Sequence, residues 1–521
     1  MLYSDTRLQK ALLTLLSAFL IILAAPPFDL WPLAFVCLVP FYSGIRHSSP
    51  WLSAGLAWMM GFAAILGGSI WWVPLLENFA SLSLISSLGL TIAICAYQSL
   101  VFAVWAGICS LLFCKWGLSW LLTGPLCIVL AEAALPFIFK LYLSVTIWRA
   151  WPLIQAAELG GPPAVSALIV LGNLVAAETV LAISKHCWPG SAVKLGALVF
   201  IFVLALGWIR AEHIATIRRK ASVLKVGLVQ PNFGIVSIKE RKNNGDKYIR
   251  ALRQATSGLA GQKSELIIWP ESSWPYLFDR QMKHEYPPGH PWELRPGKKT
   301  KLVFGTLSHT FGGTDIYNSA VFLSETGLIA GKHDKVCLVP FAEYIPFSET
   351  FPEAAKRCRA NLPLWPDIVP GEFPKVLSDG KLRIGSLICS EDIDMNFVHK
   401  IALQKPNLLV SLINDAWFGG SAAPRQHLAL AVFRAVETRR ELVRSTNTGV
   451  SAIIDALGRV QSEGPLIDAS RNKPRQVTTL AGNVALLETF ALGPYTIRFF
   501  PYGCLLILAA AIIGTRKRRK K

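Results

Sequence analysis

The segment VKLGALVFIFVLALGWI at residues 193–209 is followed by the basic stretch IRRK at 217–220 and by VLKVGLV at 223–229. The first of these is long and apolar enough to cross the hydrocarbon core of a bilayer. The last has the short β-branched and apolar character of a buried strand. The chain therefore passes here from a membrane-spanning part into a domain of different construction.

The composition supports this division. The 521 residues are 52% hydrophobic and 16% charged, and the mean hydropathy is +0.43, which excludes an ordinary soluble enzyme over the whole length. Charge is sparse before about residue 210 and ordinary from there to about 474. We predict a transmembrane helical domain of seven spans at 1–215, a charged domain at 222–480, and a final span with a basic tail at 481–521.

Apolar segments predict about eight membrane spans in total. They lie at 11–26, 30–45, 51–73, 81–113, 117–139, 163–184, 193–209 and 502–514. Because the fourth is long enough to kink and the first and last are short, seven or nine spans are alternatives. A cleaved signal peptide is a further alternative at the N-terminus, where Arg7 and Lys10 precede an apolar run. Glu132 and Glu158, which would be costly in lipid, should face protein, water or headgroups.

Basic residues in the short loops indicate the orientation. With eight spans, Arg46, Lys115, Lys185 and the tail at 516–521 fall on one side, which the distribution of Lys and Arg assigns to the cytoplasm. The charged domain then lies on the opposite side. The basic residues at 218–220 oppose this orientation, but long domains translocate largely regardless of charge.

The formal charge of +19 favours anionic lipid headgroups as partners. We expect no nucleic acid, because no zinc-finger spacing or RNA-binding aromatic motif accompanies the scattered basic residues. Of ten cysteines, only Cys337, Cys358 and Cys389 belong to the charged domain. They have no CxxC or paired-His spacing, which argues against a zinc site and a disulfide framework.

The charged domain shows buried strands alternating with helical patterns, so its class is α/β or α+β with sheets covered by helices. Strands are predicted at 224–229, 265–269, 301–306, 319–323, 382–388, 407–413, 442–445 and 450–454. Helices are predicted at 238–259, 396–404 and 426–441.

Three reactive side chains follow these strands in the order Glu271, Lys335 and Cys389. A cysteine attacks as its thiolate and needs a base, which a desolvated Glu271 can supply. Lys335 and the backbone N–H after Cys389 would stabilise the oxyanion that forms on a carbonyl substrate. Taken alone, each residue also has a purely structural interpretation. Glu271 could be a solvated carboxylate in a turn, Lys335 a surface lysine like Lys332, and Cys389 an inert thiol in the core. Their order and flanking residues favour catalysis.

The blocks Trp269-Pro270-Glu271, Lys335 with LVPF at 338–341, and Cys389-Ser390-Glu391 resemble the signature of the nitrilase superfamily. The segments NDAWFG at 414–419, QH at 426–427 and TNTGV at 446–450 are similar to its membrane-bound branch, the apolipoprotein N-acyltransferase family. The likeness covers essentially the whole chain. It implies an αββα sandwich between the seventh and eighth of eight spans, facing the periplasm.

The resemblance also implies roles for individual residues. Glu271 would be the general base, Lys335 the oxyanion stabiliser and Cys389 the nucleophile, with Glu343, Ser390 and Glu391 in support. Ser390 stands where the family usually has an aromatic residue, Ala342 where it has glycine, and Cys337 where a polar residue is common. These departures affect substrate preference more than reaction type.

Aromatic residues are further candidates for substrate binding or gating: Trp269, Trp365 and Trp417. Trp365 lies in the segment 346–374, whose aromatic and basic residues predict contact with the lipid interface; an ordinary surface loop is the alternative. Trp417 has an alternative as a core residue of a turn. Arg434, Glu437 and Arg440 predict a salt-bridged helix face.

By the same resemblance, the protein would transfer an acyl chain from a phospholipid donor to a diacylglyceryl-apolipoprotein acceptor. It would act as a monomer in the bacterial inner membrane, in contact with membrane lipids. No metal or diffusible cofactor is expected, because proton transfer and oxyanion stabilisation suffice. Two alternatives remain at this point, a membrane-tethered amidase and a non-catalytic lipid-binding or transport protein.

Overall fold

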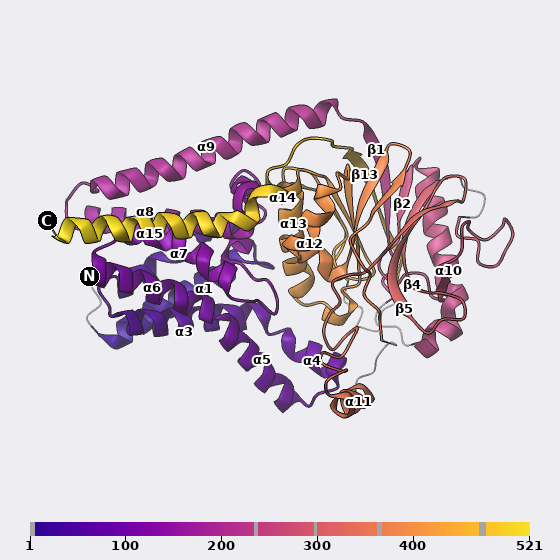
Figure 1. Cartoon of the computed structure of the whole chain (residues 1–521), viewed down its shortest axis with the longest axis horizontal. Coiled ribbons are helices and arrows are strands. Elements are labelled where there is room, and N and C mark those ends of the chain that lie inside the picture. Colours follow the sequence, from indigo (N-terminus) through magenta and orange to yellow (C-terminus); the bar gives the residue numbers. More distant parts are fainter. Residues whose placement is uncertain (1–5, 234–237, 296–299, 362–366, 468–475, 521) are drawn as a thin grey trace. The chain divides into compact units, whose positions relative to one another are not determined.

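The computed structural model describes residues 6–233, 238–295, 300–361, 367–467 and 476–520. The chain divides into two compact units, drawn in Figure 1. The helical unit comprises Met1–Trp72, Leu88–His213 and Ala491–Lys521, and the α/β unit comprises Val73–Ser87 and Ile214–Phe490.

The helices outside the α/β sandwich are mostly long and apolar. Their bounds are α1 Arg7–Ala24, α2 Val39–Ile45, α3 Pro50–Ser69, α4 Trp72–Ala80, α5 Leu84–Gln98, α6 Leu100–Trp116, α7 Trp120–Ala134, α8 Ala157–Ser184, α9 Ser191–Lys220, α14 Gly493–Thr496 and α15 Phe500–Lys520. Within the described residues, six helical stretches are long and apolar enough to cross a membrane, and two shorter apolar helices accompany them at Trp31–Ile45 and Trp120–Ala134. Each predicted span overlaps one of these eight, and the number of spans remains a prediction.

Glu132 and Glu158 of the helical unit are buried in protein contacts, as expected from the cost of a carboxylate in lipid. Glu158 pairs with Arg210 at 2.7 Å and accepts the backbone N–H of Leu492. Glu132 accepts the Leu143 backbone N–H at 3.1 Å and the Ser166 hydroxyl at 3.0 Å. Both residues therefore tie segments of the helical unit together.

The α/β unit contains two sheets. One has the order β13-β1-β2-β4-β5-β6 with β3 beside β4, and the other has the order β12-β11-β10-β9-β8-β7. The strands are β1 Val223–Gln230, β2 Leu266–Ile268, β3 Phe278–Asp279, β4 Lys301–His309, β5 Ile316–Leu323, β6 Ile329–Asp334, β7 Val376–Asp379, β8 Leu382–Ile388, β9 Leu408–Ile413, β10 Leu442–Thr446, β11 Ala452–Ile454, β12 Val460–Glu463 and β13 Thr478–Ala485. Strands β1, β2 and β4 run parallel, as do β8, β9 and β10.

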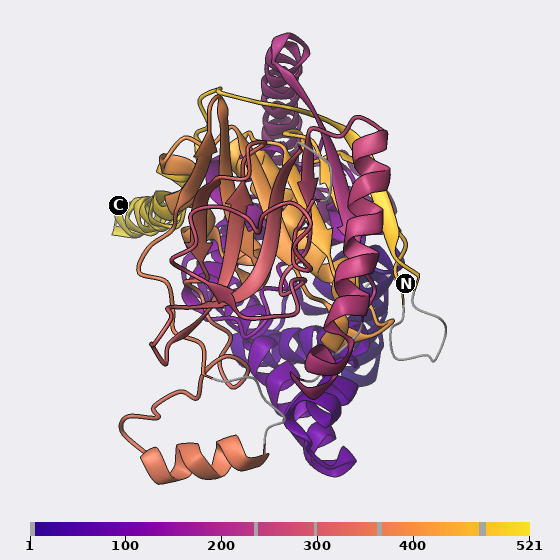
Figure 2. The ribbon, with the colours of Figure 1, turned by 90° about the vertical axis from the view of Figure 1, so that its right-hand side faces the viewer.

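The sheets pack face to face between helices. Apolar side chains from both sheets, such as Phe322 and Val410, form one buried cluster. A second cluster joins the other face of the first sheet to helix α10 Ile238–Gly261. Helices α12 Met395–Leu403 and α13 Ala423–Thr438 cover the second sheet (Figure 1), and Figure 2 shows α10 lying across the first. The predicted helical membrane domain and αββα sandwich are thus confirmed.

Candidate active site

The fold brings the three predicted reactive residues together at strand ends: Glu271 and Lys335 follow strands of the first sheet, and Cys389 follows a strand of the second sheet, which packs against the first. Glu271 follows β2 and Cys389 follows β8. Strand β6, antiparallel to β5, runs parallel to β4 and ends just before Lys335. The carboxyl ends of parallel strands share one edge of a sheet, where clefts for ligands commonly form. Side chains separated by 118 positions of sequence therefore converge on one site.

Lys335 forms the centre of a buried charge cluster. Its side chain is 1% exposed, and the ammonium Nζ lies 2.9 Å from Glu343 Oε2 and 3.5 Å from Glu271 Oε1. Burial alone would lower the pKa of Lys335, but the negative charges of Glu343, Cys389 and Glu271 raise it well above the ordinary value. Lys335 is therefore a permanent cation between two carboxylates.

Asn318 on β5 links the two carboxylates from the other side. Its amide nitrogen Nδ2 donates to Glu271 Oε1 at 2.8 Å and to Glu343 Oε1 at 3.1 Å. Glu343 also accepts the backbone N–H of Val339 at 2.9 Å. Asn318 was missed in the sequence, where it lies just before a predicted strand and belongs to none of the motifs.

Glu271 has the environment of a general base. The residue is 7% exposed, and burial raises the pKa of its carboxyl, with Lys335 opposing and Glu343 adding to the shift. The Cys389 thiol is one of its hydrogen-bond partners. A carboxylate with a raised pKa that contacts a thiol is suited to take the thiol proton.

Cys389 occupies a strained position at the start of a 3-10 turn, η4 Cys389–Ile393, with φ of 51°. A non-glycine residue adopts this left-handed conformation only at an energetic cost, and such strain is concentrated at functional sites. Burial, followed by the Glu271 charge, raises the pKa of the thiol well above its ordinary value, while Lys335 opposes the shift. The resting cysteine is thus a thiol that needs a base.

Glu391 connects the lysine segment to the cysteine segment. Its fully buried carboxylate accepts the backbone N–H groups of Val336 at 2.6 Å and Ile388 at 2.9 Å. The Ser390 hydroxyl makes a second connection by donating to the Cys337 carbonyl at 3.2 Å. The two predicted supporting residues therefore hold Lys335 and Cys389 in register.

A glycine on β4 lets the segment that carries Glu271 approach the sheet closely. A Cβ added to Gly305 would lie 2.5 Å from the Pro270 carbonyl oxygen and 2.6 Å from the Glu271 Cα. Both are backbone atoms, so the clash cannot be relieved by a side-chain rotation. Any larger residue at 305 would displace Glu271.

The aromatic candidates lie in different surroundings. Trp269 is fully buried in the cluster under α10 and donates to Thr256 at 2.9 Å, so its side chain packs in the core of the α/β unit. Trp417 is partly exposed on a short 3-10 helix at Ala416–Phe418. The alternative interpretation, in which Trp417 is buried in the core, therefore does not hold. Trp365 lies outside the described residues. In the segment before it, Phe347 is 75% exposed and Phe351 is 62% exposed.

The residues predicted to form a salt-bridged face on α13 are buried. Arg434 pairs with Glu437 at 2.6 Å, and both side chains are almost inaccessible. Arg440 follows the helix and donates to backbone carbonyls, including that of Pro406 at 2.5 Å. These residues therefore stabilise the packing of α13 against its surroundings.

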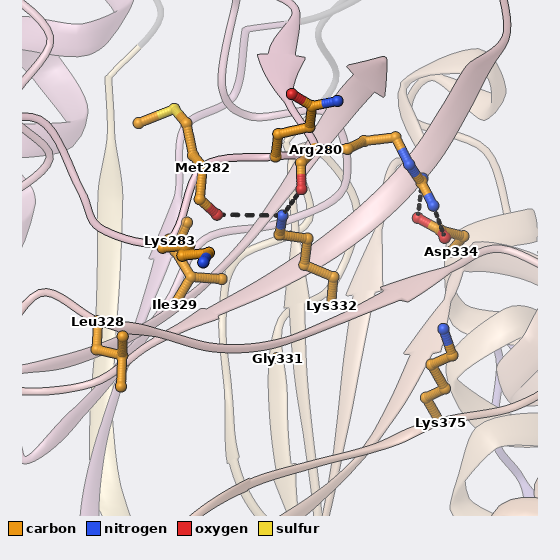
Figure 3. Close-up of a pocket in the computed structure, with 10 residues that line it drawn as sticks. Arg280, Met282, Lys283, Leu328, Ile329, Gly331, Lys332, Asp334 and Lys375 are labelled. Atoms are coloured by element: carbon orange, nitrogen blue, oxygen red, sulfur yellow. Dashed lines mark hydrogen bonds and ion pairs between the residues drawn. The ribbon is translucent and has the colours of Figure 1, made fainter. Parts of the chain in front are cut away.

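A groove of about 480 Å³ has four basic residues in its lining, Arg280, Lys283, Lys332 and Lys375, and includes none of the three reactive residues (Figure 3). Arg280 holds Asp334 through two contacts of 2.8 Å in its wall, and Lys332 donates to the Met282 carbonyl at 3.3 Å. Because Asp334 immediately precedes Lys335, the Arg280 pair fixes the end of the strand that leads to Lys335.

Comparison with known proteins gives a consistent result over both units. Residues 225–466 match the carbon-nitrogen hydrolase family model, and residues 17–175 match the model of the apolipoprotein N-acyltransferase N-terminal domain. The chain is 30% identical to the apolipoprotein N-acyltransferase of Geobacter metallireducens, over 98% of this chain and 95% of the relative. It is 29% identical to that of Azotobacter vinelandii, over 98% and 96%.

Among solved structures, Nit3 of Saccharomyces cerevisiae, described as a member of branch 10 of the nitrilase superfamily, is similar to part of the chain. The match covers 54% of this chain and 94% of Nit3, at 16% identity and a TM-score of 0.34.

Proposed function

Because this chain belongs to the apolipoprotein N-acyltransferase family, we propose that it N-acylates the N-terminal diacylglyceryl-cysteine of lipoproteins with an acyl chain taken from phospholipid. The observation that carries the proposal is the buried contact of Lys335 with Glu271 and Glu343 beside the Cys389 thiol. This arrangement supplies a base, a cation and a nucleophile within one site.

In the first step, the Glu271 carboxylate takes the proton of the Cys389 thiol as sulfur attacks the ester carbonyl carbon of the phospholipid. The Lys335 ammonium and the backbone N–H of Ser390 stabilise the oxyanion of the tetrahedral intermediate. The bond from carbon to the glycerol oxygen then breaks, and the departing oxygen takes the proton from Glu271. The products are an acyl thioester on Cys389 and a lysophospholipid.

In the second step, the α-amine of the diacylglyceryl-cysteine attacks the thioester carbonyl carbon. Glu271 accepts a proton from the attacking nitrogen, the carbon–sulfur bond breaks, and the departing sulfur receives the proton. The product is an amide at the lipoprotein N-terminus, and the free thiol is regenerated. The same base thus serves both half-reactions.

The location we propose is the bacterial inner membrane, with the region 222–480 in the periplasm and both termini in the cytoplasm. Several long apolar helices support membrane insertion, and the basic short loops and tail support this orientation. A lipid donor and a lipid-modified acceptor are both present at the outer face of that membrane.

Intact-mass analysis of the purified full-length protein incubated with phospholipid tests the proposal. An increment of one acyl chain is expected on the peptide that contains Cys389, and hydroxylamine should remove it. Adding a synthetic diacylglyceryl-cysteine peptide should discharge the thioester into N-acyl peptide. Release of free fatty acid instead would identify the amidase-type alternative, and an increment on Cys337 would refute Cys389 as nucleophile.

A further inference from the structure

A second charge cluster lies immediately behind the nucleophile and is not used by the proposed reaction. It contains Asp392 on η4, Asp415 after β9, His427 on α13 and Arg444 on β10, and each side chain is at least 96% buried. The four elements that meet here are distant in sequence. Burying four ionisable side chains is costly unless they compensate one another.

The distances show that they do. Arg444 contacts both carboxylates, that of Asp392 directly and that of Asp415 at 3.0 Å. His427 lies between the same two residues, with Nε2 2.9 Å from Asp392 Oδ1 and Nδ1 2.9 Å from Asp415 Oδ1. The Ser411 hydroxyl donates to Asp392 at 3.1 Å.

The geometry fixes the protonation state of His427. A neutral imidazole carries one N–H, so it can donate to only one of two ionised carboxylates. An imidazolium donates from both ring nitrogens and so satisfies the two contacts of 2.9 Å. Burial and Arg444 would lower the pKa of His427, but the two aspartates raise it above the ordinary value. The cluster then holds two positive and two negative charges.

We propose that Asp392, Asp415, His427 and Arg444 form a neutral ion network whose function is to position Cys389, with the His427 imidazolium as its bridge. The network anchors η4, the turn that begins with Cys389, to β9, β10 and α13. This anchoring opposes relaxation of the left-handed backbone at Cys389. The inference rests on the proposed role of Cys389 as nucleophile and makes the four residues positioning residues.

The network also sets the field at the thiol. Asp415 is one of the charges that raise the pKa of Cys389, together with Glu271 and Glu343 and against Lys335. Removing the His427 cation leaves the network with one uncompensated negative charge. Cys389 should then ionise at higher pH, because a nearby negative charge disfavours the thiolate.

The test compares H427Q with H399Q in the full-length protein. His399 is a matched control, since it is also a buried histidine, 3.0 Å from Glu437, but it contacts no residue of the network. The first readout is the pH dependence of Cys389 alkylation by iodoacetamide, quantified on its own peptide. The second is the rate of thioester formation from phospholipid.

For H427Q we expect the alkylation midpoint to rise by roughly one pH unit and thioester formation to slow by about ten- to a hundredfold. H399Q should change neither. A folded H427Q with the wild-type profile and rate would overturn the inference. Alkylation requires no acyl transfer, so failure of the proposed function would leave this readout intact.

A second variant keeps the test informative if H427Q does not fold. D415N/H427Q removes one charge of each sign and leaves Asp392 paired with Arg444. Its alkylation profile should return close to that of the wild type, while thioester formation stays slow because the bridge to Asp415 is lost. A wild-type rate of thioester formation in this variant would refute the positioning role.

Discussion

Replacing Gly305 by alanine should slow acylation of Cys389 while the α/β unit remains folded. Gly305 on β4 donates its backbone N–H to the Pro270 carbonyl at 3.2 Å, so the strand and the Glu271 segment lie in direct backbone contact. An alanine Cβ on the same backbone would lie 2.5 Å from that carbonyl oxygen and 2.6 Å from the Glu271 Cα.

The size of the effect follows from these distances. Ordinary van der Waals contact begins at 3.4 Å, so Glu271 must move by nearly 1 Å relative to β4. A displacement of about 1 Å at a catalytic group lowers rates by roughly a hundredfold. Overpacking of this kind costs about 1–3 kcal/mol of stability. We therefore expect a large loss of rate and a modest loss of stability.

The assay is the rate of thioester formation, followed by intact mass after rapid acid quenching. G258A is the matched control, because Gly258 lies on α10 of the same unit and a Cβ there meets nothing within 4 Å. G258A should acylate at the wild-type rate. If folded G305A also acylates at that rate, the close approach of Gly305 does not position Glu271.

Three further predictions concern charge and topology. Lys335→Met should abolish thioester formation and destabilise the α/β unit by about 3–5 kcal/mol, because two carboxylates lose their buried cation. In the double variant Lys335→Met/Glu343→Gln, thermal unfolding should show that part of the lost stability returns, while thioester formation stays absent. Since the pKa of Glu271 is raised and the base must be ionised, thioester formation should fall on acidification through a pH above the usual range of glutamate. A pH profile that stays flat down to about pH 4 would contradict this assignment. An impermeant thiol reagent should label Lys263→Cys in intact spheroplasts and leave a cysteine at Arg516 unlabelled; the reverse pattern would refute the proposed orientation.

The sequence predicted the interior of both sheets and missed their borders. Every predicted strand corresponds to β1, β2, β4, β5, β8, β9, β10 or β11. The missed strands β13, β6, β12 and β7 are the four sheet edges, and β3 pairs only with the end of β4. An interior strand is apolar on both faces and is visible as a hydrophobic run. An edge strand such as β6, with the sequence IAGKHD, carries the polar residues that protect an exposed border.

The site residues that were predicted and those that were missed differ in a similar way, by whether local sequence marks them. Glu271, Lys335 and Cys389 each lie in a short block whose neighbours mark it, so local sequence identified them. Asn318 bridges two carboxylates only because β5 passes beside both segments. The Asp415–His427 contact joins residues 12 positions apart that no helical or strand periodicity relates. Such contacts depend on packing between elements, which a single sequence does not contain.

In the reaction that we propose, the arrangement around Lys335 would let a buried site develop an oxyanion at low energetic cost. Before attack, one cation stands between the carboxylates of Glu271 and Glu343. As Glu271 takes the thiol proton, its charge disappears while an equal charge forms on the substrate oxygen, so the total charge of the site is unchanged. Lys335 lies closer to Glu343, at 2.9 Å, than to Glu271, at 3.5 Å. Glu343 can therefore hold the Lys335 ammonium in place while negative charge moves from the Glu271 carboxylate to the oxyanion. The site then has no need to reorganise or to admit water during the attack on the ester.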